Sequence, residues 1–493
     1  MDSPIGLPQP EDIIRRSVPE LVRDRPIGRR VSAARFRSYM VMLEVIADFG
    51  TVIAAATLAY GIYSRMGEGK TLHYSQLLVF EISAALAGVI VLMLDRVGTY
   101  SGGTSLLRVR ETEQVLRVSA QVLTVAFGVS VLVDLPFSRW LLVITAVLLP
   151  LFLFVQKHLI YMLVQVLHSR GYGIERVLIY GSGSTARRVY SVLQRSPKLG
   201  LDPVAFVDEN LAKAGSTIFE MGYEPRRSAP VIRAPLTRDL VARYDADLVI
   251  VAMPSLQQPK LQQTVQVLAA QTRVSFVPSN FLQPDSWVDF QDIDGVLLAS
   301  LGGAPKRHAY EWAKRLSDVT GAVVLLALGL PVLLLLAILI RLESEGPAIF
   351  CQERVGLHGR RFRMFKFRTM YVDAAAYAYS PRVPGDPRIT PLGRFLRRTS
   401  LDELPQLINV LVADMSLVGP RPEMPFIAEQ YTDQHRQRLQ VKPGITGLWQ
   451  LSGDRAYLIH ENIEYDLYYI QHRNFFLDMA ILVHTTIFAM RGI

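Results

Sequence analysis

The chain has 493 residues, of which half are hydrophobic and only 20% are charged. This composition is too apolar for an ordinary soluble enzyme and too polar for a transporter with many spans, so we expect a membrane region joined to soluble domains. The net charge of +9 predicts an anionic partner, and the single cysteine, Cys351, excludes an internal disulfide and a cysteine-based zinc site.

The first part of the chain has the pattern of a membrane region. Residues 1–38 are polar and arginine-rich, and we expect a cytoplasmic basic tail without a cleavable signal peptide. Four apolar runs follow within residues 39–168, at about 39–63, 75–94, 118–135 and 140–167, and each is long enough to cross about 30 Å of hydrocarbon as a helix. Asp48 interrupts the first run and is expected to face a neighbouring helix or lie near an interface, with a functional intramembrane charge as the alternative. Arginines before the first run and between the second and third place the N-terminus, and everything after residue 168, in the cytoplasm.

Residues 174–300 alternate strand and helix patterns, which predicts a Rossmann-like domain with a parallel sheet. An apolar strand leads into Gly181-Ser-Gly183 and then a helix, and a second strand ends at Asp208. Glycines at these positions would let a pyrophosphate approach the helix N-terminus, and Asp208 lies near where a ribose-binding acid is expected. The pattern leaves two interpretations open, a structural or regulatory turn and a nucleotide site.

A fifth apolar run covers residues 319–340 and has Pro331 near its middle. If this run crossed the membrane, the arginine-rich block after it would lie outside, against the positive-inside rule. Proline removes a helix hydrogen bond and bends the segment. We therefore expect a re-entrant helix whose two ends both return to the cytoplasmic face, with an ordinary kinked spanning helix as the alternative.

The last domain, residues 308–493, is basic in its central part. Lysine and arginine outnumber aspartate and glutamate between Gln352 and Lys442, and many of the arginines stand in Gly/Pro-punctuated turns at 359–370 and 419–422. Rigid turns that present arginine suit a small diphosphate. Nucleic acid fits less well, because aromatic stacking platforms are not regularly interleaved, and we expect no nucleic-acid partner.

Within this block, Ser400-Leu-Asp402-Glu403 matches a helix capping box, followed by a helical stripe of leucines. Asp402 would then lie in the first helical turn, where the helix dipole and neighbouring arginines favour its ionised form. An ionised aspartate can attack phosphorus to form an acyl phosphate, and positive surroundings would stabilise the transferred phosphoryl group. The pattern thus allows a structural helix start and a nucleophile.

Six ordered motifs extend over the last third of the chain. They are Lys314-Arg-x-x-Asp318, the Pro-broken apolar run, Phe365-Lys-Phe-Arg-Thr-Met370, Leu401-Asp-Glu-Leu-Pro-Gln406, Met415-Ser-Leu-Val-Gly-Pro-Arg-Pro-Glu423 and Val441-Lys-Pro-Gly-Ile-Thr-Gly-Leu-Trp-Gln450. With these motifs the chain resembles the catalytic domain of the bacterial sugar transferases, also called monotopic phosphoglycosyl transferases. The four spans and the Rossmann-like domain extend the likeness to the large polyprenyl-phosphate hexose-1-phosphate transferases.

The resemblance implies an enzyme that transfers a hexose-1-phosphate from a UDP-hexose to undecaprenyl phosphate at the lipid bilayer of the bacterial inner membrane. UMP would be released, and exopolysaccharide, capsule or O-antigen synthesis would begin with this step. Asp402 would be the nucleophile and a Mg²⁺ ligand, while Glu403 would assist proton transfer, organise the pair or cap the helix. Arg421 and Pro422 would bind phosphate, with Lys366 and Arg368 in the same basic pocket. The resemblance also allows a homodimer.

The predicted fold class is membrane α plus α/β. It combines a four-helix transmembrane region, a Rossmann-like parallel-sheet domain and an α-rich catalytic domain on a Pro-broken re-entrant helix. Two other functions stay open. One is a membrane-anchored NAD-dependent nucleotide-sugar epimerase or dehydratase that would use residues 174–300, and the other is a non-enzymatic regulator of polysaccharide assembly. Neither of these would require the Asp402 carboxylate.

Overall fold

The computed structural model describes most of the chain in thirteen segments. These are residues 33–66, 74–100, 108–132, 138–195, 200–209, 217–219, 228–252, 272–276, 287–293, 296–302, 308–372, 386–451 and 463–490. Most of the predicted basic tail, residues 1–32, lies outside them. The chain divides into two compact units, the first made of Met1–Leu106 with Val118–Leu282 and the second of Leu107–Arg117 with Gln283–Ile493.

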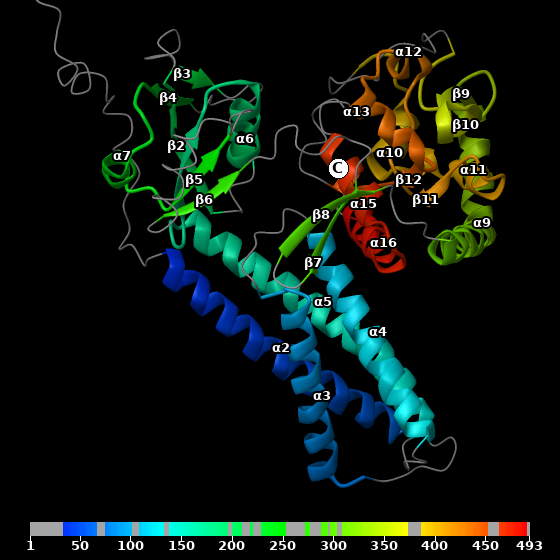
Figure 1. Ribbon diagram of the computed structural model, residues 1–493. Coiled ribbons are helices and arrows are strands. Elements are labelled where there is room, and N and C mark those ends of the chain that lie inside the picture. Colours follow the sequence, from blue (N-terminus) through cyan, green and yellow to red (C-terminus); the bar gives the residue numbers. More distant parts are fainter. Residues whose placement is uncertain are drawn as a thin grey trace, which may run out of the picture. The chain divides into compact units, whose positions relative to one another are not determined.

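Long apolar helices dominate the first unit. They are α2 (Ala33–Tyr63), α3 (Gln76–Arg96) and α5 (Arg139–Ser169), together with most of α4 (Arg108–Leu132), whose first turns belong to the second unit (Figure 1). With α9 (His308–Glu343) of the second unit, five helices in the described part of the chain are long and apolar enough to cross a membrane. Length and composition therefore support a membrane protein, but they do not separate the four predicted spans from the fifth run, and the count of four is not confirmed.

Asp48, the polar interruption predicted for the first span, is fully buried in the first unit. Lys157 Nζ on α5 donates hydrogen bonds to Asp48 Oδ2 at 2.6 Å and to Glu44 Oε1 at 2.5 Å, and the Tyr100 hydroxyl donates to Asp48 Oδ2 at 2.5 Å. A charge removed from water is retained only when it is paired and hydrogen-bonded. The expectation that Asp48 faces a neighbouring helix is confirmed.

A six-stranded sheet forms the rest of the first unit. Its strand order is β3-β4-β2-β1-β5-β6, with parallel pairing from β4 to β6 and β3 antiparallel at the edge. The elements are β1 (Glu175–Tyr180), α6 (Ser184–Arg195), β2 (Leu201–Val207), β3 (Thr217–Phe219), β4 (Ser228–Ile232), α7 (Arg238–Arg243), β5 (Leu248–Val251) and β6 (Arg273–Phe276). The parallel part has the order of a Rossmann-like fold, which confirms the predicted parallel sheet.

Alternation along β1 explains how helices cover both faces of this sheet. Val177 and Ile179 pack in one cluster with Tyr190 of α6, whereas Leu178 packs in another with Leu240 of α7. Successive side chains of a strand point to opposite faces. The two helices therefore cover opposite faces, as Figure 1 shows.

The second unit combines short strand pairs with many helices. An antiparallel hairpin of β7 (Trp287–Ile293) and β8 (Val296–Gly302) precedes α9, and a second hairpin of β9 (Ile349–Val355) and β10 (Arg361–Phe367) follows it. Later, β11 (Ser416–Val418) pairs in parallel with β12 (Gly444–Thr446). The longer helices are α10 (Pro391–Thr399), α11 (Gln406–Leu411), α15 (Ile463–His472) and α16 (Phe475–Met490), and the four-residue helices are α12 (Pro425–Ala428), α13 (Asp433–Arg436) and α14 (Leu448–Leu451).

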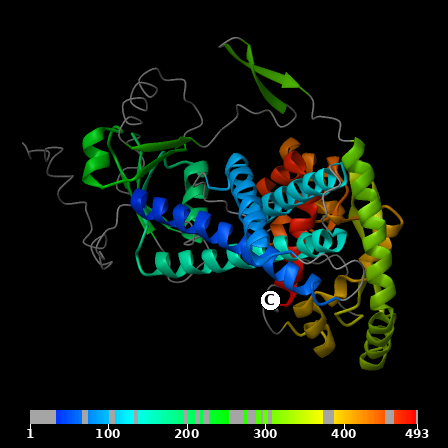
Figure 2. The same ribbon diagram turned by 90° about the horizontal axis from the view of Figure 1, so that it is seen from below.

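Helix α9 is attached to the second unit near both of its ends. Near its start, the Arg315 guanidinium donates hydrogen bonds to the carbonyls of Val410 and Leu411 at 2.7 and 2.9 Å. At its end, the Arg368 guanidinium donates to the Ser344 carbonyl at 2.7 Å. Pro331 lies inside the helix, which changes direction along its length (Figure 2), and most large apolar side chains of its middle part are exposed. The unit thus holds the two ends of an apolar helix whose middle is uncovered.

Candidate active site

Asp402 and Glu403 lie in a tight turn between two helices. Helix α10 ends at Thr399, Ser400 adopts a left-handed conformation with φ +56°, and a single 3₁₀ turn covers Leu401–Glu403 before α11 begins at Gln406. The Ser400 side chain makes no capping hydrogen bond. The predicted capping box is therefore wrong, because Ser400 ends one helix instead of starting the next. Asp402 does not lie in the first turn of an α-helix either, so the helix-dipole argument does not apply to it.

Glu403 is held by two cations from distant parts of the chain. Lys366 Nζ and Arg421 Nη2 each donate a hydrogen bond to Glu403 Oε1 at 2.9 Å. Lys366 comes from β10, and Arg421 comes from the Gly-Pro-Arg-Pro turn that follows β11. The structure therefore brings together four predicted site residues, Asp402, Glu403, Lys366 and Arg421. It also places Pro422 in the buried turn beside them.

A buried amide aligns α11 with the strand that carries Lys366. Asn409 is fully buried, accepts a hydrogen bond from the backbone N–H of Phe365 at 3.0 Å and donates one to the carbonyl of Arg363 at 2.7 Å. Both donor and acceptor capacities of the amide are thus used on the free edge of β10. This clamp holds the start of α11, and with it Glu403, opposite Lys366.

The turn that carries Arg421 depends on glycine. A Cβ on Gly444 would lie 2.0 Å from the backbone nitrogen of Gly419, and a Cβ on Gly447 would lie 2.3 Å from the Gly419 carbonyl oxygen. In this close approach the Gly419 N–H donates to the Thr446 carbonyl at 2.9 Å. The glycines of two separate motifs therefore let β11 and β12 meet closely enough to direct Arg421 into the site.

Burial and charge separate the two carboxylates. Burial, which the nearby Lys366 only partly offsets, raises the pKa of Asp402 to about 6. Burial acts on Glu403 in the same direction, but the attraction of Arg421 and Lys366 outweighs it and holds the pKa of Glu403 well below its usual range. Burial also lowers the pKa of Lys366, an effect that the adjacent Glu403 opposes. Glu403 is the permanently ionised partner, whereas Asp402 can titrate near neutrality.

The Asp402 carboxylate is the open member of the pair. Among the described residues, no group donates a hydrogen bond to it, although Lys366, Arg397 and Arg421 lie close enough to act on its charge. Glu403 instead uses its carboxylate on Lys366 and Arg421. The geometry therefore assigns different duties to the two groups, one available for reaction and one engaged in holding cations.

Two arginines near the site were not predicted from the sequence. Arg354 of β9 donates a hydrogen bond to the Pro422 carbonyl at 3.3 Å, and burial and the charge of Arg421 lower its pKa to about 10. Arg397 of α10 donates to Thr369 Oγ1 at 2.8 Å and interacts with the charge of Asp402. The hairpin pattern before Lys366 was the available signal for Arg354, and the arginine-rich end of α10 was the signal for Arg397.

Arg368 was predicted to line the basic pocket, and the structure places its side chain elsewhere. It is buried, and its guanidinium donates to the backbone carbonyls of Ser344 and Glu345 and, at 3.4 Å, of Ile340. Ser344 and Glu345 directly follow the last residue of α9, and the Ile340 carbonyl in its last turn also accepts a hydrogen bond from the Ser344 N–H at 3.3 Å. Arg368 therefore caps a helix, because β10 ends at Phe367 and the chain turns away from the pocket.

Replacement of Arg368 by methionine should consequently lower stability and leave donor binding unchanged. Loss of the hydrogen bonds to the helix end is expected to reduce the free energy of unfolding by about 1–3 kcal/mol. Denaturant unfolding and the KM for the sugar donor would be measured on R368M and on R421M as its counterpart. A KM that rises equally in both variants would contradict the helix-capping assignment.

In the glycine loop of the sheet domain, Ser182 is hydrogen-bonded to Asp208 at the end of the second strand. The Gly181 backbone has φ +107°, and a Cβ on Gly183 would meet no atom within 4 Å. The Asp208 carboxylate accepts a hydrogen bond from the Ser182 N–H at 3.0 Å and another from the Ser182 hydroxyl. Asp208, which was expected to bind a ribose, is thus hydrogen-bonded to the loop itself. These contacts agree with a structural turn, and nucleotide binding here stays a prediction.

Comparisons with known protein families match two separate regions of the chain. A family model described as bacterial sugar transferase matches residues 309–492, and one described as CoA-binding domain matches residues 96–278. The undecaprenyl-phosphate galactose phosphotransferase of Salmonella typhimurium is 31% identical over 72% of this chain and 76% of its own length. The UDP-glucose:undecaprenyl-phosphate glucose-1-phosphate transferase of Xanthomonas campestris is 33% identical over 65% and 68%.

A shorter relative matches a smaller part of the chain. An uncharacterized sugar transferase of Bacillus subtilis is 42% identical over 172 residues, which are 35% of this chain and 84% of the relative. The similarity to the two longer relatives thus covers about two thirds or more of this chain, whereas the shorter relative covers about a third of it. The chain belongs to the bacterial sugar transferase family and is a transferase.

Proposed function

We propose that this enzyme transfers a hexose-1-phosphate from a UDP-hexose to undecaprenyl phosphate through a covalent intermediate on Asp402. The donor and acceptor classes are those in the names of the Salmonella and Xanthomonas relatives. The observation that carries the mechanism is the open, partly buried Asp402 carboxylate beside a Glu403 whose own charge is already balanced by Lys366 and Arg421. Production of the lipid-linked sugar would begin polysaccharide synthesis.

In the first step, a carboxylate oxygen of Asp402 attacks the phosphorus that bears the sugar. A new P–O bond forms to Asp402, the P–O bond to the UMP portion breaks, and UMP leaves with that bond's electron pair. In the second step, a phosphate oxygen of undecaprenyl phosphate attacks the same phosphorus and releases the Asp402 carboxylate. The product is undecaprenyl diphospho-sugar, so each transfer regenerates the enzyme.

The cationic side chains explain why a carboxylate can attack an anionic diphosphate. Arg421 is poised to bind phosphate oxygens, and Lys366 lies beside it through their shared partner, Glu403. Preorganised cations that face developing negative charge stabilise the transition state without reorganising during the reaction. Glu403 acts here by holding these two cations, and its low pKa makes it a poor proton acceptor at neutral pH.

The donor set at Asp402 fits Mg²⁺. The described residues contain no cluster of three or more His, Cys, Asp or Glu side chains that would form an all-protein metal site. Mg²⁺ often uses only one or two carboxylates together with substrate phosphates and waters. Asp402 would supply the protein oxygen, and the bound ion would offset charge on the donor diphosphate.

A re-entrant α9 agrees with the attachment of both helix ends to the second unit. A straight helix of its 36 residues would be about 54 Å long, which exceeds the membrane thickness. Arg315 near one end and Arg368 at the other both bind within the same unit. Since Pro331 interrupts the helix hydrogen bonding between them, we infer that α9 enters and leaves on the cytoplasmic face of the inner membrane.

The proposed function is tested with β-³²P-labelled UDP-sugars and enzyme in lipid nanodiscs. UDP-glucose, UDP-galactose and their N-acetylated forms would each be mixed with the enzyme and Mg²⁺ and quenched, after which labelled protein would be quantified. Undecaprenyl phosphate is then added as a chase. We expect one donor to label the protein and the label to pass to lipid. Absence of label in lipid with every donor would refute the proposal.

The rate of enzyme labelling should depend on the ionisation of Asp402. Because its pKa is raised to about 6, the reactive carboxylate is mostly present above pH 6 and is lost as the pH falls through that value. Glu403, with its lowered pKa, stays ionised throughout. The single-turnover rate of UMP release, measured between roughly pH 5 and pH 8, should rise with pH as expected for the ionisation of one group and then level off. A rate that falls over this interval would assign the titration to another group.

A further inference from the structure

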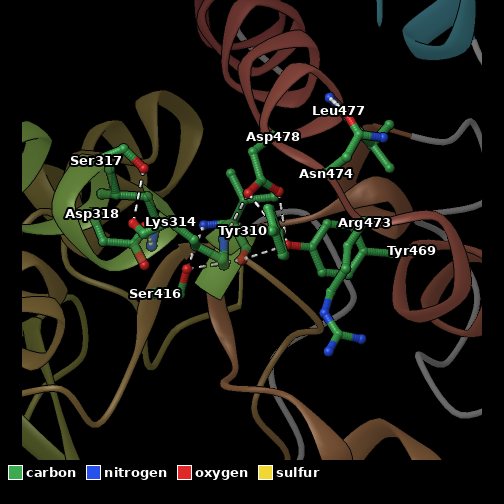
Figure 3. A network of polar contacts seen from close by, with 12 residues as sticks. Tyr310, Lys314, Ser317, Asp318, Ser416, Tyr469, Arg473, Asn474, Leu477 and Asp478 are labelled. Carbon is green, nitrogen blue, oxygen red and sulfur yellow. Dashed lines mark hydrogen bonds and ion pairs between the residues drawn. The ribbon is translucent and has the colours of Figure 1, made fainter. Parts of the chain in front are cut away.

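A buried polar network in the second unit lies outside the Asp402 site. At its centre, Asp478 of α16 is only 3% exposed and accepts hydrogen bonds at Oδ2 from the Tyr310 hydroxyl at 2.9 Å and from Lys314 Nζ at 3.0 Å. The Tyr469 hydroxyl of α15 lies 2.8 Å from Asp478 Oδ1. Figure 3 shows these groups meeting between the start of α9 and the helices α15 and α16. We call these four residues the Asp478 network.

The same network continues to β11. Asp318, one turn beyond Lys314 on α9, is 5% exposed and accepts a hydrogen bond from the Leu417 backbone N–H at 3.1 Å. The Tyr469 hydroxyl also lies 3.1 Å from the Val418 carbonyl. The first motif of the catalytic region, Lys314-Arg-x-x-Asp318, is thereby explained. Its lysine and aspartate bind two different parts of the second unit just before the apolar run of α9 begins.

At its other side the network reaches α4. Asn474 accepts a hydrogen bond from the Leu477 N–H at 3.0 Å, which caps the start of α16 one turn from Asp478. Its amide nitrogen donates to Glu113 Oε1 of α4 at 3.0 Å. Farther along these helices, Thr112 Oγ1 of α4 and His484 Nε2 of α16 are hydrogen-bonded at 2.9 Å. The first turns of α4 are therefore bound to the helix that carries Asp478.

Two helices with membrane-spanning character thus start from one polar assembly. Helix α4 continues beyond the second unit as one of the candidate spans, and α9 is another. Asn474 and Asp478, four residues apart on one helix start, hold α4 and α9 respectively. Since the first turns of both helices are bound to α16, a shift of either helix start relative to α16 would break one of these partly buried contacts.

We propose that Asp478 and Asn474 are positioning residues for the lipid acceptor, which set the depth of the Asp402 site at the bilayer surface. The inference rests on the proposed two-step function. A soluble nucleotide sugar reaches the site at any depth, whereas the phosphate of the polyprenyl acceptor is confined to the level of the lipid headgroups. Displacement of a site by about 1 Å can cost roughly a hundredfold in rate. Loss of the network therefore slows the second step selectively.

The test separates the two half-reactions in D478N. Asparagine retains the size of the side chain but removes the charge that pairs with Lys314. In nanodiscs, labelling by the UDP-sugar and UMP release should stay within about twofold of the wild type, while transfer of the trapped label to undecaprenyl phosphate slows roughly ten- to a hundredfold. The acceptor KM and the chase rate would be measured together with the melting temperature.

Two further variants isolate the role of the network. E113A removes the contact of α4 with Asn474 without changing a residue of the Asp478 network, and the same selective slowing of the chase is expected. E311Q is the matched control. Glu311 Oε1 at the start of α9 forms an ion pair at 3.0 Å with Arg473 Nη2, which lies just before α16, but the Glu311 side chain is about half exposed. An exposed pair contributes little, so both half-reactions should be unchanged.

The results distinguish failure of this inference from failure of the proposed function. If the wild-type protein acquires no label from any donor, the proposed covalent mechanism is wrong. The inference about the second half-reaction then fails with it, because that step starts from the labelled enzyme. If the wild type is labelled but D478N and E113A slow both half-reactions equally, or neither, the network has only a structural role and the inference is overturned. A D478N protein that does not fold leaves E113A as the deciding variant.

Discussion

Replacement of Asp402 by asparagine is expected to abolish covalent labelling and to reduce sugar transfer at least about a thousandfold. Asparagine has nearly the same volume as aspartate and, among the described residues, no hydrogen bond to the Asp402 side chain would be lost. The fold should therefore survive while the nucleophile disappears. Labelled protein and labelled lipid would be quantified in parallel, with circular dichroism to verify folding.

Glu403→Gln is the informative neighbour of that variant. Glutamine keeps an oxygen that can accept hydrogen bonds from Lys366 and Arg421, but it removes the charge that balances them. We expect slower labelling that still occurs at Asp402, because the cations lose their anchor and the nucleophile remains. Undiminished labelling of D402N, or its loss only in E403Q, would reverse the roles assigned to the two carboxylates.

Replacement of Gly444 by alanine is expected to have the second largest effect. The new methyl group would lie 2.0 Å from the Gly419 nitrogen and 2.6 Å from the Thr446 carbonyl oxygen, and both are backbone atoms that a side-chain rotation cannot move. Overpacking of this kind costs about 1–3 kcal/mol or more. The two strands must separate, and Arg421 moves with the turn that follows Gly419, so activity should fall roughly a hundredfold.

Gly183→Ala provides the control, since its Cβ would enter open space. Its free energy of unfolding should change by less than about 0.5 kcal/mol, with sugar transfer unaffected. Thermal melts and single-turnover labelling would be compared for the two glycine variants. Equal stability of G444A and the wild type would show that the β11–β12 contact is looser than the structure indicates.

Much of the fold followed from local patterns. The apolar runs at 39–63 and 140–167 lie within α2 and α5. The strand expected directly before Gly181 is β1, and the strand expected to end at Asp208 is β2, which ends one residue earlier. These elements are long or strongly apolar, so burial of one face or of the whole segment determines them. Lys366, Arg421 and the two carboxylates were also identified from sequence, and the structure brings them together.

The turn at Ser400 could not be read locally. A serine before an acidic residue is typical of a helix start, yet here the chain must reverse because α10 and α11 bury their leucines in different clusters. Leu396 packs with Ile340 and Phe367, whereas Leu407 packs in the main core of the second unit. Whether Ser400 ends one helix or starts the next is decided by tertiary packing, which cannot be predicted from the residues around position 400 alone. Arg368 illustrates the same limit, since the end of β10 decides where its side chain goes.

The binding of α4 to the catalytic unit has a consequence for synthesis on the ribosome. Thr112 and its partner His484 are 372 residues apart. At about 5–20 residues per second, roughly 20 to 75 s separate the emergence of the two surfaces. During that interval Val109, which is buried in the finished core, has no partner from the C-terminal part of the chain. The second unit must therefore complete its folding on a helix that was made long before the rest of that unit.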